Sequence, residues 1–279
     1  MGKCHGFEEG VTRRHSVVML VVDQKKTYMY RFFVEKEQIN RFDNTASITG
    51  PDRNHIKNVL RMKEGEEVSL MVSGEENEYR CSVTGYTDDA VELKLLFIKE
   101  SNVELPCEVV LYQALPKADK MELIITKSVE LGVSRIVPVA AKRSVVRLEG
   151  GRQDKKITRW NTISETAAKQ SKRAVIPPVS PVMTIKEALA DCSVFDHKII
   201  PYELADHDNM NDTRKIIDSI RPGSKVAIMI GPEGGFEEGE VAQATAAGFT
   251  PITLGHRILR TETAPLVVLS WIMYMVEQT

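Results

Sequence analysis

The sequence predicts an α/β protein in which a small β-rich domain, residues 29–100, precedes a larger domain, residues 101–279, of alternating strands and helices. In the first domain, apolar and polar residues alternate over several short runs, which is the period of strands that bury one face. In the second, short β-branched runs are separated by helical stretches, as in a mostly parallel sheet covered by helices. An aperiodic, charged stretch at 99–107 is the expected linker.

The first domain is expected to be a small barrel with one helical insert. Alternation marks strands within residues 68–72, 79–83 and 91–97, and a hairpin-like loop at 73–77 joins the first two. The insert is expected to be a helix at residues 52–61, which ends before a charged turn.

Residues 1–28 are expected to be an upstream extension of the functional protein. Arg13 and Arg14 precede an apolar run, residues 17–22, as in some export signals. The run is only six residues long and stops at Asp23, which is too short for a signal core or a membrane span.

Composition excludes several classes of protein. Apolar residues make up 42% and charged residues 27% of the chain, which is ordinary for a globular enzyme and not for a disordered or fibrous protein. The four cysteines form no CxxC pair and the six histidines lack zinc-ligand spacing. We therefore expect no metal centre, no membrane association and a reducing, cytoplasmic environment.

In the second domain, strands are expected at residues 109–112, 135–139, 198–202, 225–230 and 250–254. A helix should begin after Asp119, whose side chain could cap it, and stop at Gly132. A second, basic helix is expected at residues 154–170.

The final helix, residues 265–276, is apolar on nearly every face, whereas a surface helix would carry a polar stripe. It must therefore be covered, either by a second subunit or by its own domain. The side chains expected to face a partner are Leu266, Leu269, Ile272, Met273 and Val276.

Two loops carry the strongest chemical signal. The first, Gly-Pro-Glu-Gly-Gly-Phe at 231–236, follows the strand at 225–230, and the second, residues 254–265, follows the next strand. Ligands of open α/β sheets bind at the carboxyl ends of strands, and glycines there allow close approach of a ligand to the backbone. Neither loop is a Walker or GxGxxG phosphate loop, so one pocket for an adenosine-type cofactor is the better interpretation. A purely structural turn at 231–236 is the alternative.

The second loop has a competing structural explanation. Thr261 or Thr263 could cap the final helix, and Glu262 would favour its positive end. Capping does not explain Arg257 and Arg260, which flank two apolar residues.

These loops resemble those of the ribosomal small-subunit RNA uracil-N3 methyltransferases of the SPOUT superfamily. The resemblance extends over about residues 29–279, and its N-terminal part resembles that family's PUA-like β-barrel domain. The family usually has proline at His256 and an acid at Lys169. Further matching segments are Gln113 to Lys117, Lys127 to Val133, Arg143 to Val146, Arg159-Trp160, Gln170 to Arg173, Arg31 to Val34, and His55 with Val59 to Arg61.

The resemblance implies S-adenosylmethionine as cofactor and N3 of a uridine in 16S ribosomal RNA, within the small subunit, as target. It also implies a mostly parallel sheet with a C-terminal trefoil knot, and a homodimer. At the matching positions the expected cofactor site consists of Gly231, Pro232, Glu233, Gly234, Gly235, Leu254, Gly255, Ile258, Leu259, Arg260, Thr263 and Ala264.

Methylation at uridine N3 requires help with the nucleophile, because N3 carries a proton at neutral pH. A carboxylate could remove that proton, and an arginine could hold the charge that spreads onto the ring oxygens. Arg260 is the expected anion-stabilising group, and Glu233 and Glu262 are the candidate bases, each with a structural role also available.

The net charge of −2 gives no global attraction to RNA, so RNA binding must depend on a local patch. Residues 135–173 hold eleven Lys/Arg and three acids. This segment predicts a phosphate-contacting surface, with a solvated helix face as the alternative. The expected RNA-binding residues are Arg31, Arg61, Lys117, Arg143, Lys172 and Arg173.

Two other functions fit these patterns. A 2′-O-ribose methyltransferase on the same fold would activate a hydroxyl instead of an imide, and the product nucleoside distinguishes the two. A non-catalytic RNA-binding assembly factor could also retain the fold, and S-adenosylmethionine binding would count against it.

Overall fold

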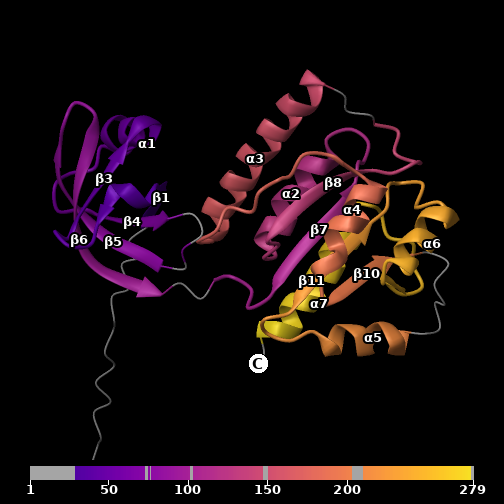
Figure 1. Ribbon diagram of the computed structural model, residues 1–279. Helices are drawn as coiled ribbons and strands as arrows, with labels where there is room; N and C mark the ends of the chain where they lie inside the picture. Colours follow the sequence, from indigo (N-terminus) through magenta and orange to yellow (C-terminus); the bar gives the residue numbers. More distant parts are fainter. Residues whose placement is uncertain are drawn as a thin grey trace, which may run out of the picture.

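A computed structural model describes residues 29–72, 75, 77–100, 103–146, 150–202 and 210–277 (Figure 1). The expected extension at 1–28 and most of the loop at 73–77 lie outside the described residues. No helix within the described part of the chain is long and apolar enough to cross a membrane.

The first domain is one six-stranded sheet in the order β1-β4-β5-β6-β3-β2. β1 pairs parallel with β4, and the other pairs are antiparallel. Inward side chains from β1 and from β3, which lie far apart in this order, share one core, so the sheet curls on itself as a barrel does. The strands are β1 (Tyr30–Val34), β2 (Ile39–Asn40), β3 (Thr45–Thr49), β4 (Glu67–Val72), β5 (Asn77–Tyr86) and β6 (Ala90–Glu100).

The helical insert begins two residues earlier than the sequence predicts. It consists of α1 (Gly50–Asn54) followed by a π-helical segment, η2 (His55–Leu60), and a short 3-10 helix η1 (Lys36–Gln38) precedes it. Arg61 ends η2 in the left-handed conformation, with φ +53°.

The second domain is a parallel six-stranded sheet in the order β12-β10-β11-β7-β8-β9, which confirms the expected class of fold. Five of these strands match the sequence prediction, and the two-residue β9 was not predicted. The strands are β7 (Glu108–Ala114), β8 (Arg135–Ala140), β9 (Met183–Thr184), β10 (His197–Pro201), β11 (Lys225–Ile230) and β12 (Thr250–Ile252).

Helices cover both faces of this sheet. Buried residues of α2, α3, α5 and α7 share one core, and those of α4 and α6 share the core on the opposite face. The helices are α2 (Lys120–Glu130), α3 (Gly151–Ser171), α4 (Ile185–Asp191), η3 (Cys192–Val194), α5 (Met210–Ser219), α6 (Glu238–Ala246) and α7 (Ala264–Glu277).

The two ends of α2 differ in how well they follow the prediction. The side chain of Asp119 occupies the N-cap position but makes no capping hydrogen bond. Gly132 follows the helix with φ +89°, and a Cβ there would lie 2.5 Å from the Leu105 side chain. Glycine is therefore required for both the turn and the packing of the linker.

Half of the final helix is covered by its own domain. Leu269, Ile272 and Val276 are at most 2% exposed and belong to the core beneath α7. The expectation that these three side chains face a partner is therefore wrong. The rest of α7 carries half-buried or exposed apolar side chains, namely Leu266, Val267, Trp271, Met273 and Tyr274, of which Trp271 also packs partly against the same core.

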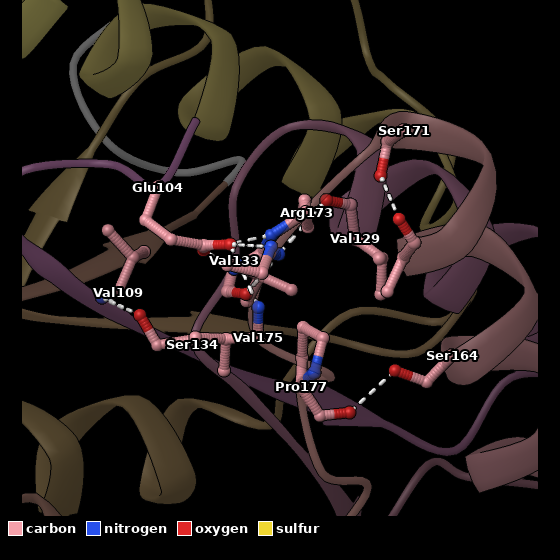
Figure 2. A network of polar contacts seen from close by, with 12 residues as sticks. Glu104, Val109, Val129, Val133, Ser134, Ser164, Ser171, Arg173, Val175 and Pro177 are labelled. Carbon is pink, nitrogen blue, oxygen red and sulfur yellow. Dashed lines mark hydrogen bonds and ion pairs between the residues drawn. The ribbon is translucent and has the colours of Figure 1, made fainter. Parts of the chain in front are cut away.

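A buried ion pair anchors the linker to the second domain (Figure 2). Arg173 donates from Nε to Glu104 Oε2 at 3.0 Å and from Nη1 to the carbonyls of Val129 and Val133 at 3.0 and 2.7 Å. Glu104 Oε1 accepts from the backbone N–H of Ala174 at 2.9 Å. The acid of the linker is thus held by the residues that follow α3.

The first domain also contacts the end of α3 directly. Arg31 of β1 donates to the Lys172 carbonyl at 2.7 Å and forms an ion pair with Glu78 at 3.2 Å. Lys169 Nζ lies 5.9 Å from the centre of the Phe33 ring, within the range of a cation–π contact.

Candidate active site

A cavity of about 390 Å³ lies at the carboxyl ends of β10, β11 and β12. Loop 231–236 after β11 and loop 253–264 after β12 supply most of its wall, so the structure brings the two predicted loops together. Pro201 at the end of β10, Tyr202 after it and Lys120 of α2 also line the cavity, and none of these three was predicted from the sequence.

The conformation of loop 231–236 depends on its glycines. Gly235 has φ +68° and its N–H donates to the Pro232 carbonyl at 2.9 Å, which closes a tight turn. A Cβ on Gly231 would lie 3.2 Å from the Phe236 ring. Gly234 is different: it does not line the cavity, and a Cβ there would meet only the Arg143 side chain, at 3.6 Å.

Thr261 joins the two loops. Its hydroxyl donates to the Gly231 carbonyl at 2.7 Å and accepts from Gln113 Nε2 of β7 at 3.0 Å. This hydroxyl therefore connects loop 231–236, β7 and the segment before α7, so Thr261 is not the cap of α7 among the two threonines considered for that role. Thr263 is exposed and is not part of the cavity wall.

Six of the predicted cofactor residues in the second loop line the cavity. Leu254, Leu259 and Ala264 form an apolar part of the wall. Gly255 has φ +97°, a backbone conformation that favours glycine. Ile258 and Arg260 are exposed, as is Arg257, which also lines the cavity. The wall is thus apolar inside and cationic at its exposed edge.

Two carboxylates and one ammonium group form the charged part of the site. Lys120 Nζ lies 3.1 Å from Glu233 Oε1 and 3.2 Å from Glu262 Oε2. Glu262 Oε2 is buried, and its ion pair with Lys120 is its closest charged contact among the described residues. Arg260 Nη1 lies 3.9 Å from Glu262 Oε1, and the Arg260 side chain is 80% exposed.

The environment keeps Glu233 ionised. Burial raises the pKa of its carboxyl, but backbone hydrogen bonds from Lys117 and from Glu233 itself, together with Lys120, outweigh burial and lower the pKa below its ordinary value. The Glu233 carboxylate in turn raises the pKa of Lys120. Glu233 is therefore held mainly as a structural anion.

The predicted RNA-binding residues fall into three groups. Arg61, Lys117, Arg143 and Lys172 are exposed. Arg31 is engaged by Glu78 and the Lys172 carbonyl. The sixth residue, Arg173, is buried.

Arg173 cannot contact RNA in this conformation. Its side chain is 4% exposed and its guanidinium is occupied by Glu104 and two carbonyls (Figure 2). The interpretation of Arg173 as an RNA-binding residue is wrong, because the charge count of residues 135–173 did not include an acid from the linker.

Within the described ranges, no group of three or more His, Cys, Asp or Glu residues has the arrangement of a metal site. Cys81, Cys107 and Cys192 are buried and free, and burial raises the pKa of each thiol to about 11 or 12. These thiols are consequently poor nucleophiles and poor metal ligands at neutral pH.

A parallel α/β domain with a loop-built pocket at its strand ends is the class of protein that binds a ligand at that edge of the sheet, and here a curled β domain precedes it. Residues 103–273 match the RNA methyltransferase domain family, and residues 48–96 match the RNA methyltransferase PUA domain family. The chain belongs to this family of RNA methyltransferases.

Relatives named ribosomal RNA small subunit methyltransferase E match nearly the whole chain. That of Bacillus subtilis is 39% identical over 252 residues, which are 89% of this chain and 98% of the relative. The crystal structure of the Neisseria gonorrhoeae protein of that name, bound to S-adenosyl methionine, is 34% identical, with TM-score 0.72 and coverage of 87% and 96%. A putative methyltransferase from Legionella pneumophila in complex with the same cofactor is 28% identical, with TM-score 0.72 and coverage of 88% and 97%.

Proposed function

We propose that the protein methylates N3 of a uridine in 16S ribosomal RNA of the small subunit, with S-adenosylmethionine as methyl donor. The observation that carries this proposal is the pocket at the ends of β11 and β12, whose two loops are joined by Thr261 and whose walls are apolar. The relatives with this pair of domains include proteins whose structures contain the cofactor.

The residues of the pocket fit this cofactor. The apolar walls suit an adenine ring, and the carboxylates of Glu233 and Glu262 suit a cationic sulfonium and an ammonium group. No glycine-rich phosphate loop is present in these two loops, so a polyphosphate is disfavoured. The residues that would hold the cofactor are Gly231, Pro232, Glu233, Gly235, Leu254, Gly255, Ile258, Leu259, Arg260 and Ala264.

When bound, S-adenosylmethionine supplies an electrophilic methyl group whose thioether leaving group needs no acid. The protein must therefore act on the nucleophile. Both carboxylates contact Lys120, but only Glu233 also accepts the backbone N–H of Lys117, so Glu262 is the less constrained of the two and the better candidate base. Arg260, exposed at the pocket edge, is the group proposed to hold the negative charge on the uracil oxygens.

RNA is proposed to contact the exposed cations near the pocket and on the first domain. Arg143 donates to the Gly234 carbonyl at 2.8 Å, so it lies directly beside the cofactor loop. Lys117 also lies beside that loop, because its backbone N–H donates to Glu233 Oε1 at 3.0 Å. Arg61 and Lys172 would extend the contact with phosphates away from the pocket.

A homodimer is proposed to form through the outward face of α7. Trp271 and Tyr274 leave apolar surface on this face, and Tyr274 is 61% exposed. We expect a cytoplasmic dimer, with the trefoil knot that the family resemblance implies. Glutamate at both Trp271 and Tyr274 should give monomers in sedimentation experiments. A wild-type protein that sediments as a monomer at micromolar concentration would contradict the dimer.

The proposed function is tested with purified protein, S-adenosylmethionine and small ribosomal subunits from cells that lack this gene. The expected product is 3-methyluridine in 16S ribosomal RNA, detected by mass spectrometry of nucleosides. A ribose-methylated nucleoside would instead indicate a 2′-O-methyltransferase. Absence of both cofactor binding and a methylated product would favour an assembly factor.

A further inference from the structure

Lys120 is the cation that contacts both cofactor loops through their acids. Its Nζ lies 3.1 Å from Glu233 of the loop after β11 and 3.2 Å from Glu262 of the loop after β12. The two loops are 29 residues apart in the sequence, counted between these acids, yet their carboxylates converge on this single ammonium group. Lys120 also lines the pocket.

The ammonium group is carried by a rigid element. Lys120 is the first residue of α2, and the next turn of this helix is anchored by Met121, Ile124 and Ile125, each at most 2% exposed. Three residues before the helix, the Lys117 N–H donates to Glu233 Oε1 at 3.0 Å. The start of α2 therefore fixes the position of Glu233 from two directions.

The charges around Lys120 show what its removal would do. Glu233 and Glu262 are both anions near the same atom, and two carboxylates without a cation between them repel each other. The other nearby cations cannot replace Lys120, because Arg260 is 80% exposed and 3.9 Å from Glu262, and the Lys117 side chain points to solvent. Loss of Lys120 would leave the partly buried Glu262 without a close counter-ion.

We propose that Lys120 is a positioning residue that clamps the two cofactor loops to α2 and fixes the orientation of Glu262. This inference rests on the proposed function of the pocket, because it assigns to Lys120 the preorganisation of the cofactor site and of the candidate base. Preorganised donors and acceptors need no rearrangement when the ligand binds.

The test compares three variants of the full chain: Lys120→Met, Lys120→Arg and, as matched control, Lys127→Met. Lys127 lies on the same helix and pairs with Glu130 at 2.8 Å, away from the pocket. Calorimetry should show that Lys120→Met weakens S-adenosylmethionine binding by about tenfold or more, whereas Lys127→Met leaves it unchanged. Lys120→Arg keeps the charge and should bind within about threefold of wild type.

The pH dependence of cofactor binding distinguishes loss of the contacts that Lys120 makes with the two loops from a general loss of structure. Lys120 is one of the groups that lower the pKa of Glu233, so in Lys120→Met that pKa should rise and the acid limb of cofactor binding should move to higher pH. Wild-type affinity together with an unmoved acid limb in Lys120→Met would overturn the inference. If Lys120→Met does not fold, a loss of binding of tenfold or more in folded Lys120→Arg would overturn it. A wild-type protein that binds no S-adenosylmethionine would overturn the proposed function itself.

Discussion

The sequence predicts a cofactor pocket from two loops and an RNA-binding surface from the basic segment 135–173. In the structure the two regions differ in how many of their predicted residues are available for that role. In the loops, most predicted residues converge on one cavity. In the basic segment, many cations are paired with acids from elsewhere in the chain: Arg135 with Asp191, Arg159 with Glu122, Lys142 with Glu237, and Arg173 with Glu104. The conformation of a glycine turn is determined by the local sequence, whereas the role of a charged side chain depends on the groups that lie beside it in the folded protein.

Residues of the basic segment either stabilise the fold or are free to bind RNA, and the largest effect of a substitution, on stability, is expected at Arg173. Arg173→Leu would leave Glu104 buried without its cation, which typically costs about 3–5 kcal/mol of unfolding free energy. The exposed neighbour Lys172 provides the control, since Lys172→Leu should change stability by at most about 0.5 kcal/mol. Chemical denaturation measures both, and equal stability of the two variants would contradict the structural role of Arg173.

The next effect concerns the loop after β11. Gly235→Ala forces a side chain into φ +68° at the pocket wall, which costs about 1–2 kcal/mol and should weaken S-adenosylmethionine binding by about tenfold. Gly234→Ala should bind normally, because Gly234 lies outside the cavity wall and has room for a Cβ. Calorimetry on the two variants measures the difference in their affinity for the cofactor. A larger loss at Gly234 than at Gly235 would show that the pocket is placed wrongly.

Among the basic residues, RNA binding should depend on unpaired cations rather than on total charge. Lys172→Gln should weaken RNA binding and make its dependence on salt concentration shallower by about one unit of slope. Arg159→Gln, which removes a cation already paired with Glu122, should change the slope less. Equal slopes for both variants, measured by filter binding over a range of salt, would indicate a diffuse electrostatic attraction instead.

The smallest effect is a pH dependence of cofactor binding. The pKa of Glu233 is below its ordinary value of 4.5, so its carboxylate is present above that pH and is lost as pH falls through the lowered pKa. We expect S-adenosylmethionine affinity to be flat from about pH 8 to about pH 5 and to decline only in more acidic solution. Glu233→Gln should abolish that decline. An acid limb near neutral pH in the wild-type protein would contradict the assigned environment of Glu233.

The sequence predicted the features that depend on local pattern. The strand at 225–230 matches β11 at both ends, and the stop at Gly132 is enforced by the chain itself, through a left-handed φ and contact with Leu105. The apolar final helix was also predicted, because a run of large apolar side chains must be buried.

The features that were missed depend on contacts between distant segments. Lys120 gives no local signal, since a lysine at a helix start is ordinary until two loops more than 100 residues away converge on it. The Thr261 hydroxyl could have capped α7, and only the positions of Gly231 and Gln113 show that it joins loops instead. Arg173 was assigned to RNA because its partner lies in the linker, 69 residues away.

The measurement that tests the central claim most directly is nucleoside mass spectrometry of 16S ribosomal RNA from a strain that lacks this gene. We expect 3-methyluridine to be absent from that strain, to return when the wild-type gene is supplied, and to stay at a small fraction of its normal level when the supplied gene carries Arg260→Leu. Normal levels of 3-methyluridine in the strain without the gene would contradict that claim.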